Sequence, residues 1–166
     1  MKSIVIMGVA GSGKSSLARA VAAEFGVPMV EGDDFHPPAN LAKMRSGTPL
    51  DDADRAGWLA ALGAELQRLA GGAVLSCSAL KRAYRASLRE AVPDLKFVFL
   101  EIDRASARER VATRAAEHLF PASLVDSQFA VLEPPMGEPG VLTLKATEEP
   151  GHLQALVRAW IASGGS

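Results

Sequence analysis

Several features that define broad classes of protein are scarce in this sequence. Cys77 is the single cysteine among 166 residues, so no disulfide can form within the chain, and this favours a reducing compartment. The formal net charge is -1, which gives no general attraction to nucleic acid or to an anionic membrane. The first apolar run, residues 4–6, is too short for a signal peptide, and no later run could span a bilayer. We therefore expect a cytoplasmic protein that binds neither nucleic acid nor membrane.

Apolar residues are plentiful, and their pattern predicts an α/β fold. They make up 48% of the chain, enough for the core of one domain spanning residues 1–166. Helical spacing from Leu17 to Phe25 stops at Gly26, and the same spacing from Trp58 to Leu69 predicts a helix ending at Gly71. Apolar runs between the helices predict a five-stranded parallel sheet, covered on both faces in an α/β/α arrangement. The expected strands are residues 3–7, 28–30, 73–77, 96–101 and 141–145.

A complete P-loop motif lies between the first expected strand and the first helix. Its glycines let backbone N–H groups converge on phosphate oxygens, and the following helix adds its positive end. Lys14 is expected to reach the β- and γ-phosphates of ATP, and Ser15 to ligate Mg²⁺. A glycine-rich turn that serves packing alone is the weaker alternative, since both motif and context fit. The nucleotide-binding residues are therefore Gly8, Val9, Ala10, Gly11, Ser12, Gly13, Lys14, Ser15 and Ser16.

Acidic residues follow the second expected strand, in the segment Glu31-Gly-Asp-Asp-Phe-His-Pro. The carboxyl ends of parallel strands open onto one crevice, so these acids should face the phosphate that the P-loop holds. Asp33 is our candidate for the general base, or for a ligand of Mg²⁺ through water. In the alternative, Asp33 or Asp34 only caps the next helix. His36 is as well suited to a structural contact as to a substrate contact.

Further motifs, in order along the chain, resemble the gluconokinase family. They are Gly-Asp-x-x-His-Pro at 32–37, Asn40, Lys43-Met44, Gly47, 49–52, Asp54-Arg55, Trp58-Leu59, 77–81, Tyr84-Arg85, 127–129 and 132–134. The resemblance covers nearly the whole chain. It implies an adenylate-kinase-like core that makes 6-phospho-D-gluconate from D-gluconate and ATP with Mg²⁺. It also implies a homodimer, the usual state in that family.

A sugar acid needs cations and hydrogen-bond partners, and several residues could supply them. Lys81 and Arg85 follow the third expected strand, and Lys43 lies on the helix after Asp33. We expect these three cations and Gln128 to bind the substrate, while Arg82 and Arg45 are weaker candidates. For any one of them a solvated helix face is the alternative.

The segment of about residues 110–129 is predicted to form a lid over the site. Closure would bring Arg110 or Arg114 onto the transferring phosphate. The lid departs from the family pattern, because Arg114 lies four residues before His118 rather than three. The register of the lid is therefore open, and so is the choice of arginine.

Three other functions fit the sequence less well than that of a gluconokinase. Shikimate kinase has a glycine triplet after its third strand, where this chain has Cys77-Ser-Ala-Leu. A GTP-binding switch protein reads guanine with Asn-Lys-x-Asp, but Asn40 is the only asparagine and Leu-Ala-Lys follows it. A nucleotide-binding regulator without catalysis stays open, because P-loops can bind without transferring phosphate.

Overall fold

The computed structural model of the chain describes residues 1–114 and 123–165. Five strands form one sheet in the order β2-β3-β1-β4-β5, and every neighbouring pair is parallel. This confirms the predicted five-stranded parallel sheet, and the predicted strand ends differ from the observed ends by one residue at most. The strands are β1 (Ile4–Met7), β2 (Met29–Glu31), β3 (Val74–Ser76), β4 (Lys96–Glu101) and β5 (Val141–Lys145).

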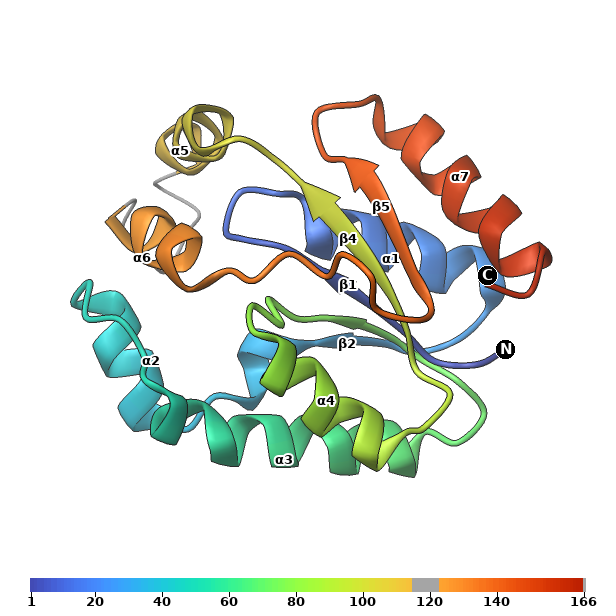
Figure 1. Cartoon of the computed structure of the whole chain (residues 1–166), viewed down its shortest axis with the longest axis horizontal. Helices are drawn as coiled ribbons and strands as arrows, with labels where there is room; N and C mark the ends of the chain where they lie inside the picture. Colours follow the sequence, from blue (N-terminus) through green and yellow to red (C-terminus); the bar gives the residue numbers. More distant parts are fainter. Residues whose placement is uncertain (115–122, 166) are drawn as a thin grey trace.

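Helices cover both faces of this sheet, as its apolar strands require (Figure 1). On one face α1 (Lys14–Phe25) packs against α7 (Pro150–Ala162), and on the other α3 (Asp52–Arg68) packs against α4 (Arg82–Ala91). The remaining helices of the described chain lie toward the carboxyl ends of the strands (Figure 1). They are α2 (Pro38–Arg45), α5 (Arg104–Thr113) and α6 (Ser123–Val131), with a short 3₁₀ turn η1 (Gly32–Phe35) between β2 and α2.

The core is centred on β1, whose four residues are at most 2% exposed. One helix end was predicted correctly and one was wrong. Helix α1 ends at Gly26, whose φ of 65° lets its N–H reach the carbonyls of Ala22 and Ala23. Helix α3 ends at Arg68 and not at Gly71; the turn glycine is Gly72, where a Cβ would lie 2.1 Å from the carbonyl oxygen of Met1. Among the described residues, no helix combines the length and apolarity needed to cross a bilayer.

Candidate active site

The P-loop joins β1 to α1 with the geometry that phosphate binding requires. Gly11 and Gly13 have φ angles of 84° and 86°, which glycine adopts without strain. A Cβ at Gly11 would also lie 2.7 Å from the carbonyl oxygen of Ala107. Gly13 is the N-cap of α1, so the helix begins at Lys14. The loop therefore presents its N–H groups and the positive end of α1 to the space beyond the strands.

A cavity of about 180 Å³ opens beside this loop and brings together residues from distant parts of the chain. Its lining includes Lys14 and Ser15 of the P-loop and Asp33 and His36 of the segment after β2. The sequence predicted all four for the site, and the structure places them around one space. Further lining comes from α2 and the segment after it, from α3, from the loop after β3 and from α6: Met44, Pro49, Leu50, Arg55, Trp58, Ser78, Leu124, Ser127, Gln128 and Val131.

A second cavity, of about 440 Å³, lies on the other side of the P-loop. It shares Gly13, Ser16 and Arg114 with the first cavity, so the two adjoin at the start of α1. Part of its lining is the segment between β5 and α7 together with the start of α7, residues 146–151. A nucleotide whose phosphates lie on the P-loop would have room there for its base. No sequence pattern indicated this segment, because it lies about 130 residues from the P-loop.

The two lid arginines that the sequence left open have different surroundings. Arg110 lines only the second cavity, where its guanidinium donates to the carbonyl oxygens of Gly11 at 3.2 Å and Ala146 at 3.0 Å. It therefore supports the P-loop from outside. Arg114 lines both cavities and is the better placed of the two for the transferring phosphate. The His118 segment used to judge the register of the lid lies outside the described residues.

Gln128 on α6 contacts the P-loop directly. Its Oε1 accepts a hydrogen bond from the backbone N–H of Ala10 at 2.7 Å, and the residue lines the first cavity. Helix α6 is held to α5 by Asp126, which pairs with Arg108 at 2.7 Å. The part of the predicted lid that is described therefore touches the loop that it is expected to cover.

Three oxygen-bearing side chains meet at the start of α1 and form a candidate Mg²⁺ site. Ser15 Oγ donates to the carboxylate of Glu31 at 2.6 Å and lies 3.1 Å from Ser76 Oγ. The ends of β2 and β3 supply Glu31 and Ser76, and β2 and β3 are neighbours in the sheet. Mg²⁺ prefers oxygen ligands and is often held by one or two carboxylates together with phosphates, so this set fits the ion. Our site prediction missed Glu31, although its position at the carboxyl end of a strand was a usable signal.

Asp33 does not cap a helix, so that alternative is wrong. It lies in η1, and the N-cap of α2 is Pro37, with no side-chain hydrogen bond at that end. The Asp33 side chain is 49% exposed and lines the same cavity as Lys14. Its neighbour Asp34 does not line the cavity. Asp33 is thus free of any capping contact and open to a substrate.

Comparison with known proteins supports this arrangement. A family model described as an AAA domain matches residues 4–135. Gluconokinase from Gluconobacter oxydans (strain 621H) is 42% identical over 159 residues, which cover 93% of this chain and 89% of that protein. The crystal structure of a gluconokinase from Sinorhizobium meliloti 1021 matches with a TM-score of 0.89 and 43% identity, covering 99% of this chain and 93% of that one. The chain belongs to the gluconokinase family.

The resemblance seen in the sequence is therefore confirmed, and so is the fold class. A sugar kinase from Janibacter sp. HTCC2649 matches this gluconokinase-family chain with a TM-score of 0.92 and 37% identity, covering 98% of this chain and 95% of that one. Solved relatives thus share the whole described fold, including the helices around the first cavity.

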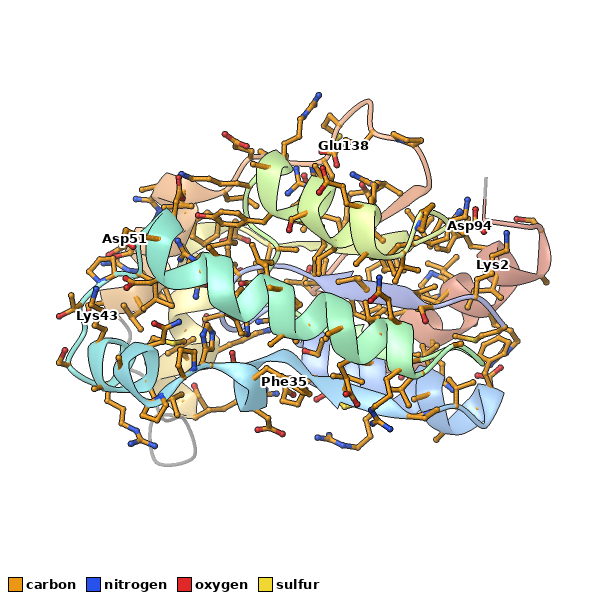
Figure 2. The ribbon with its side chains drawn as sticks, turned by 90° about the horizontal axis from the view of Figure 1, so that it is seen from below. Lys2, Phe35, Lys43, Asp51, Asp94 and Glu138 are labelled. Atoms are coloured by element: carbon orange, nitrogen blue, oxygen red, sulfur yellow. The ribbon has the colours of Figure 1, made fainter. Side chains whose placement is uncertain are left out.

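The cations predicted to bind substrate lie elsewhere in this gluconokinase-family chain. Lys43 Nζ pairs with Asp54 at 2.8 Å, and this hydrogen bond raises the pKa of Lys43. Lys81 pairs with Asp52 at 2.9 Å. Neither lysine lines the cavity. Figure 2 shows Lys43 at the α2 end of the molecule.

Arg85 is a buried structural residue, so its predicted position in the substrate site is wrong. It is fully buried, and its guanidinium donates to the carbonyls of Ala79 at 2.7 Å and Glu133 at 2.8 Å and to the carboxylate of Glu138 at 2.6 Å. Glu138 lies beside α4, across the molecule from Lys43 (Figure 2). Burial opposes its ionisation, but hydrogen bonds from Arg85 and Arg89 lower the pKa of Glu138.

One cation that lines the first cavity was missed by our site prediction. Arg55 on α3 is buried, and its Nη1 donates to the carbonyl of Leu50 at 2.8 Å and to the hydroxyl of Tyr84 at 3.2 Å. Both partners are neutral acceptors, so the positive charge of Arg55 is not cancelled by these two bonds. The Asp54-Arg55 pair belongs to the family pattern, and that was the signal available in the sequence.

The Arg85→Ala substitution should therefore destabilise the protein rather than weaken substrate binding alone. We expect a loss of about 3–5 kcal/mol in the free energy of unfolding, because Glu138 is 4% exposed and would lose its main partner. Urea denaturation measures this loss. Arg82→Ala is the matched control, since Arg82 is 65% exposed and lies 3.8 Å from Glu138; it should change stability by less than about 1 kcal/mol. A stable Arg85→Ala variant with a raised KM for the sugar acid alone would contradict the structural role.

Proposed function

We propose that the chain is a gluconokinase that transfers the γ-phosphate of ATP to the 6-hydroxyl of D-gluconate and releases 6-phospho-D-gluconate and ADP. One observation carries the proposal: Lys14 and Ser15 of the P-loop and Asp33 of η1 line the same cavity. The gluconokinases among its relatives supply the identity of the acceptor. We extend the proposal to a homodimer, which the resemblance implies, and to a cytoplasmic location, which the single cysteine favours.

In this mechanism the P-loop holds the triphosphate. Its N–H groups and the N-terminus of α1 bind phosphate oxygens, and Lys14 places a positive charge between the β- and γ-phosphates. Ser15 and Glu31 would hold Mg²⁺, which supplies further charge neutralisation on the same phosphates. Arg114 reaches the γ-phosphate from α5 as charge develops on it.

Asp33 acts on the acceptor side of the cavity. It accepts the proton of the 6-hydroxyl while the new oxygen–phosphorus bond forms and the bond from phosphorus to the β-phosphate oxygen breaks. The electron pair of the broken bond leaves with ADP. Arg55 is the cation in the cavity wall that we assign to the carboxylate of gluconate, since a charged hydrogen bond selects an acid over a neutral sugar.

A substrate panel tests the proposal and also tests the alternatives that the sequence left open. The purified chain is incubated with ATP and Mg²⁺ and with gluconate, shikimate, glycerate, glucose or AMP, and ADP release is followed. We expect kcat/KM for gluconate to exceed that for every other acceptor by at least about tenfold, because none of the others combines a carboxylate with an open-chain row of hydroxyls. Faster turnover of shikimate would overturn the choice of acceptor. ATP binding without turnover of any acceptor would identify a regulator instead of a kinase.

A further inference from the structure

The amide of Asn40 determines which nitrogen of His36 carries the proton. Asn40 is buried on α2, and its Nδ2 donates to the backbone carbonyl of Asp54 at 2.8 Å. The same Nδ2 lies 3.2 Å from Nδ1 of His36. An amide nitrogen has two protons to donate and no lone pair to offer, so Nδ1 must be the acceptor of the second proton. The proton of the neutral imidazole therefore resides on Nε2.

The carbonyl of Asp54 makes this assignment firm. If the Asn40 amide were turned over, its oxygen would face the Asp54 carbonyl oxygen, and two acceptors would meet without a proton between them. In a buried site two acceptors that face each other without a proton are strongly unfavourable. A backbone carbonyl such as that of Asp54 can only accept a hydrogen bond. It therefore sets the orientation of the Asn40 amide, and the amide sets the tautomer of His36.

Trp58 fixes the plane of the His36 ring. The two rings are stacked, with centroids 4.2 Å apart and an angle of 14° between their planes. Trp58 is itself held by a hydrogen bond of 2.7 Å from its Nε1–H to the carbonyl of Gly32. The His36 side chain is only 3% exposed, so it has little room to rotate. Ring position and tautomer are thus both set before any substrate enters.

Nε2 of His36 and the carboxylate of Asp33 lie close enough for one small group to contact both. Nε2 lies 3.9 Å from Oδ1 of Asp33, too far for a hydrogen bond between them. Both residues line the first cavity. A hydroxyl oxygen placed about 2.8 Å from each atom would accept from Nε2–H and donate its own proton to the carboxylate. This donor–acceptor pair matches a hydroxyl and would not match a carboxylate or an ether.

We propose that His36 is a neutral hydrogen-bond donor to the acceptor hydroxyl whose proton passes to Asp33, and that Asn40 and Trp58 are the positioning residues for this contact. The inference rests on the kinase function proposed above. His36 occupies one lone pair of the hydroxyl oxygen, Asp33 takes its proton, and the second lone pair is directed at phosphorus. Because the transition state of phosphoryl transfer is loose, position matters more than nucleophilic strength, and a donor to the oxygen costs little.

The protonation state of His36 agrees with this role. Burial lowers the pKa of His36, the charge of Asp33 opposes this, and the charge of Arg55 lowers it further. The effects of burial and of Arg55 both favour the neutral imidazole. A second proton would have to go to Nδ1, where the Asn40 amide offers no acceptor.

A pair of substitutions separates the donor from the ring stack. His36→Gln keeps an N–H near the position of Nε2, whereas His36→Phe keeps a flat ring against Trp58 and removes the donor. We expect His36→Phe to lower kcat with gluconate by about 10- to 100-fold with little change in the KM for ATP, and His36→Gln to recover most of that loss. Equal losses in both variants, or a normal rate in His36→Phe, would overturn the proposal.

The tautomer is measured without any turnover. Nitrogen-15 NMR of the wild-type protein should show His36 protonated at Nε2 and bare at Nδ1. A proton on Nδ1 would overturn the inference even if the chain phosphorylates gluconate. If the proton is on Nε2 but gluconate is not phosphorylated, the result counts against the proposed function and not against the tautomer. The failure of either proposal can therefore be recognised separately.

The Asn40→Asp substitution should give kcat a pH dependence that the wild type lacks. The introduced carboxylate accepts a proton from Nδ1 and raises the pKa of His36, so the neutral ring would carry its proton on Nδ1 and offer no Nε2–H. The donor returns only when the ring is protonated, so activity should rise as the pH falls through the raised pKa. Wild-type kcat should stay level over the same neutral range. A variant whose activity does not rise toward lower pH would contradict the assigned role of Asn40.

Discussion

Replacement of Lys14 by alanine is expected to lower kcat by about 10³-fold or more, on the scale known for the loss of a cation at a transferring phosphate. Lys14 begins α1 at the edge of the first cavity. The other cations lining that cavity are Arg55, whose Nη1 donates to Leu50 and Tyr84, and Arg114 on the opposite side. Neither can take the place of an ammonium group at the start of the helix.

The matched control for this experiment is Arg19→Ala. Arg19 lies on the same helix, is exposed and lines neither cavity. The Arg19→Ala substitution therefore removes one positive charge without changing the site. We expect its kcat and its KM for ATP to match those of the wild type. Near-normal turnover in Lys14→Ala, with the helix intact by circular dichroism, would remove the P-loop from the mechanism.

The sheet was predictable because its strands carry an unambiguous signal. A strand covered by helices on both faces must be apolar at every position, and β1 is apolar from Ile4 to Met7. The end of α3 was harder to predict, because its C-cap is Leu69, before the two adjacent glycines, and only Gly72 of these two has a positive φ. A helix that ends without glycine at its cap leaves little local signal in the sequence.

The phosphate side of the site could be predicted for a related reason. Gly8–Ser15 is a contiguous motif, so its local geometry follows from the sequence alone. Asp33 could be predicted because the carboxyl ends of parallel strands meet at one edge. The same rule applied to Glu31 would have found its bond to Ser15.

The acceptor side was predicted less well because charge alone does not say which partner a cation has. Lys43, Lys81 and Arg85 each find an acid in the folded chain, at Asp54, Asp52 and Glu138. These pairs form only after α2, α3, α4 and the loop before β5 have packed. The sequence indicated a cluster of cations near the site. It did not indicate that these cations form ion pairs with acids of the folded chain and so are not free to bind substrate.

Replacement of Asp33 by asparagine should lower kcat by about 10² to 10⁴-fold while the fold stays intact. Asparagine has nearly the same shape, but its amide cannot accept the hydroxyl proton as a carboxylate does. Asp33 is 49% exposed and caps no helix, so stability should change by less than about 0.5 kcal/mol. Steady-state kinetics with gluconate and thermal unfolding measure the two effects separately.

Asp34→Asn is the control for this last experiment, because the adjacent residue carries the same charge and does not line the cavity. It should keep wild-type kinetics. The His36 contact adds a further requirement: in Asp33→Asn the Nε2–H donor is unchanged, so the KM for gluconate should change less than kcat does. If Asp33→Asn turned over gluconate at the wild-type rate, neither proton transfer to Asp33 nor a shared hydroxyl between Asp33 and His36 could be part of the mechanism.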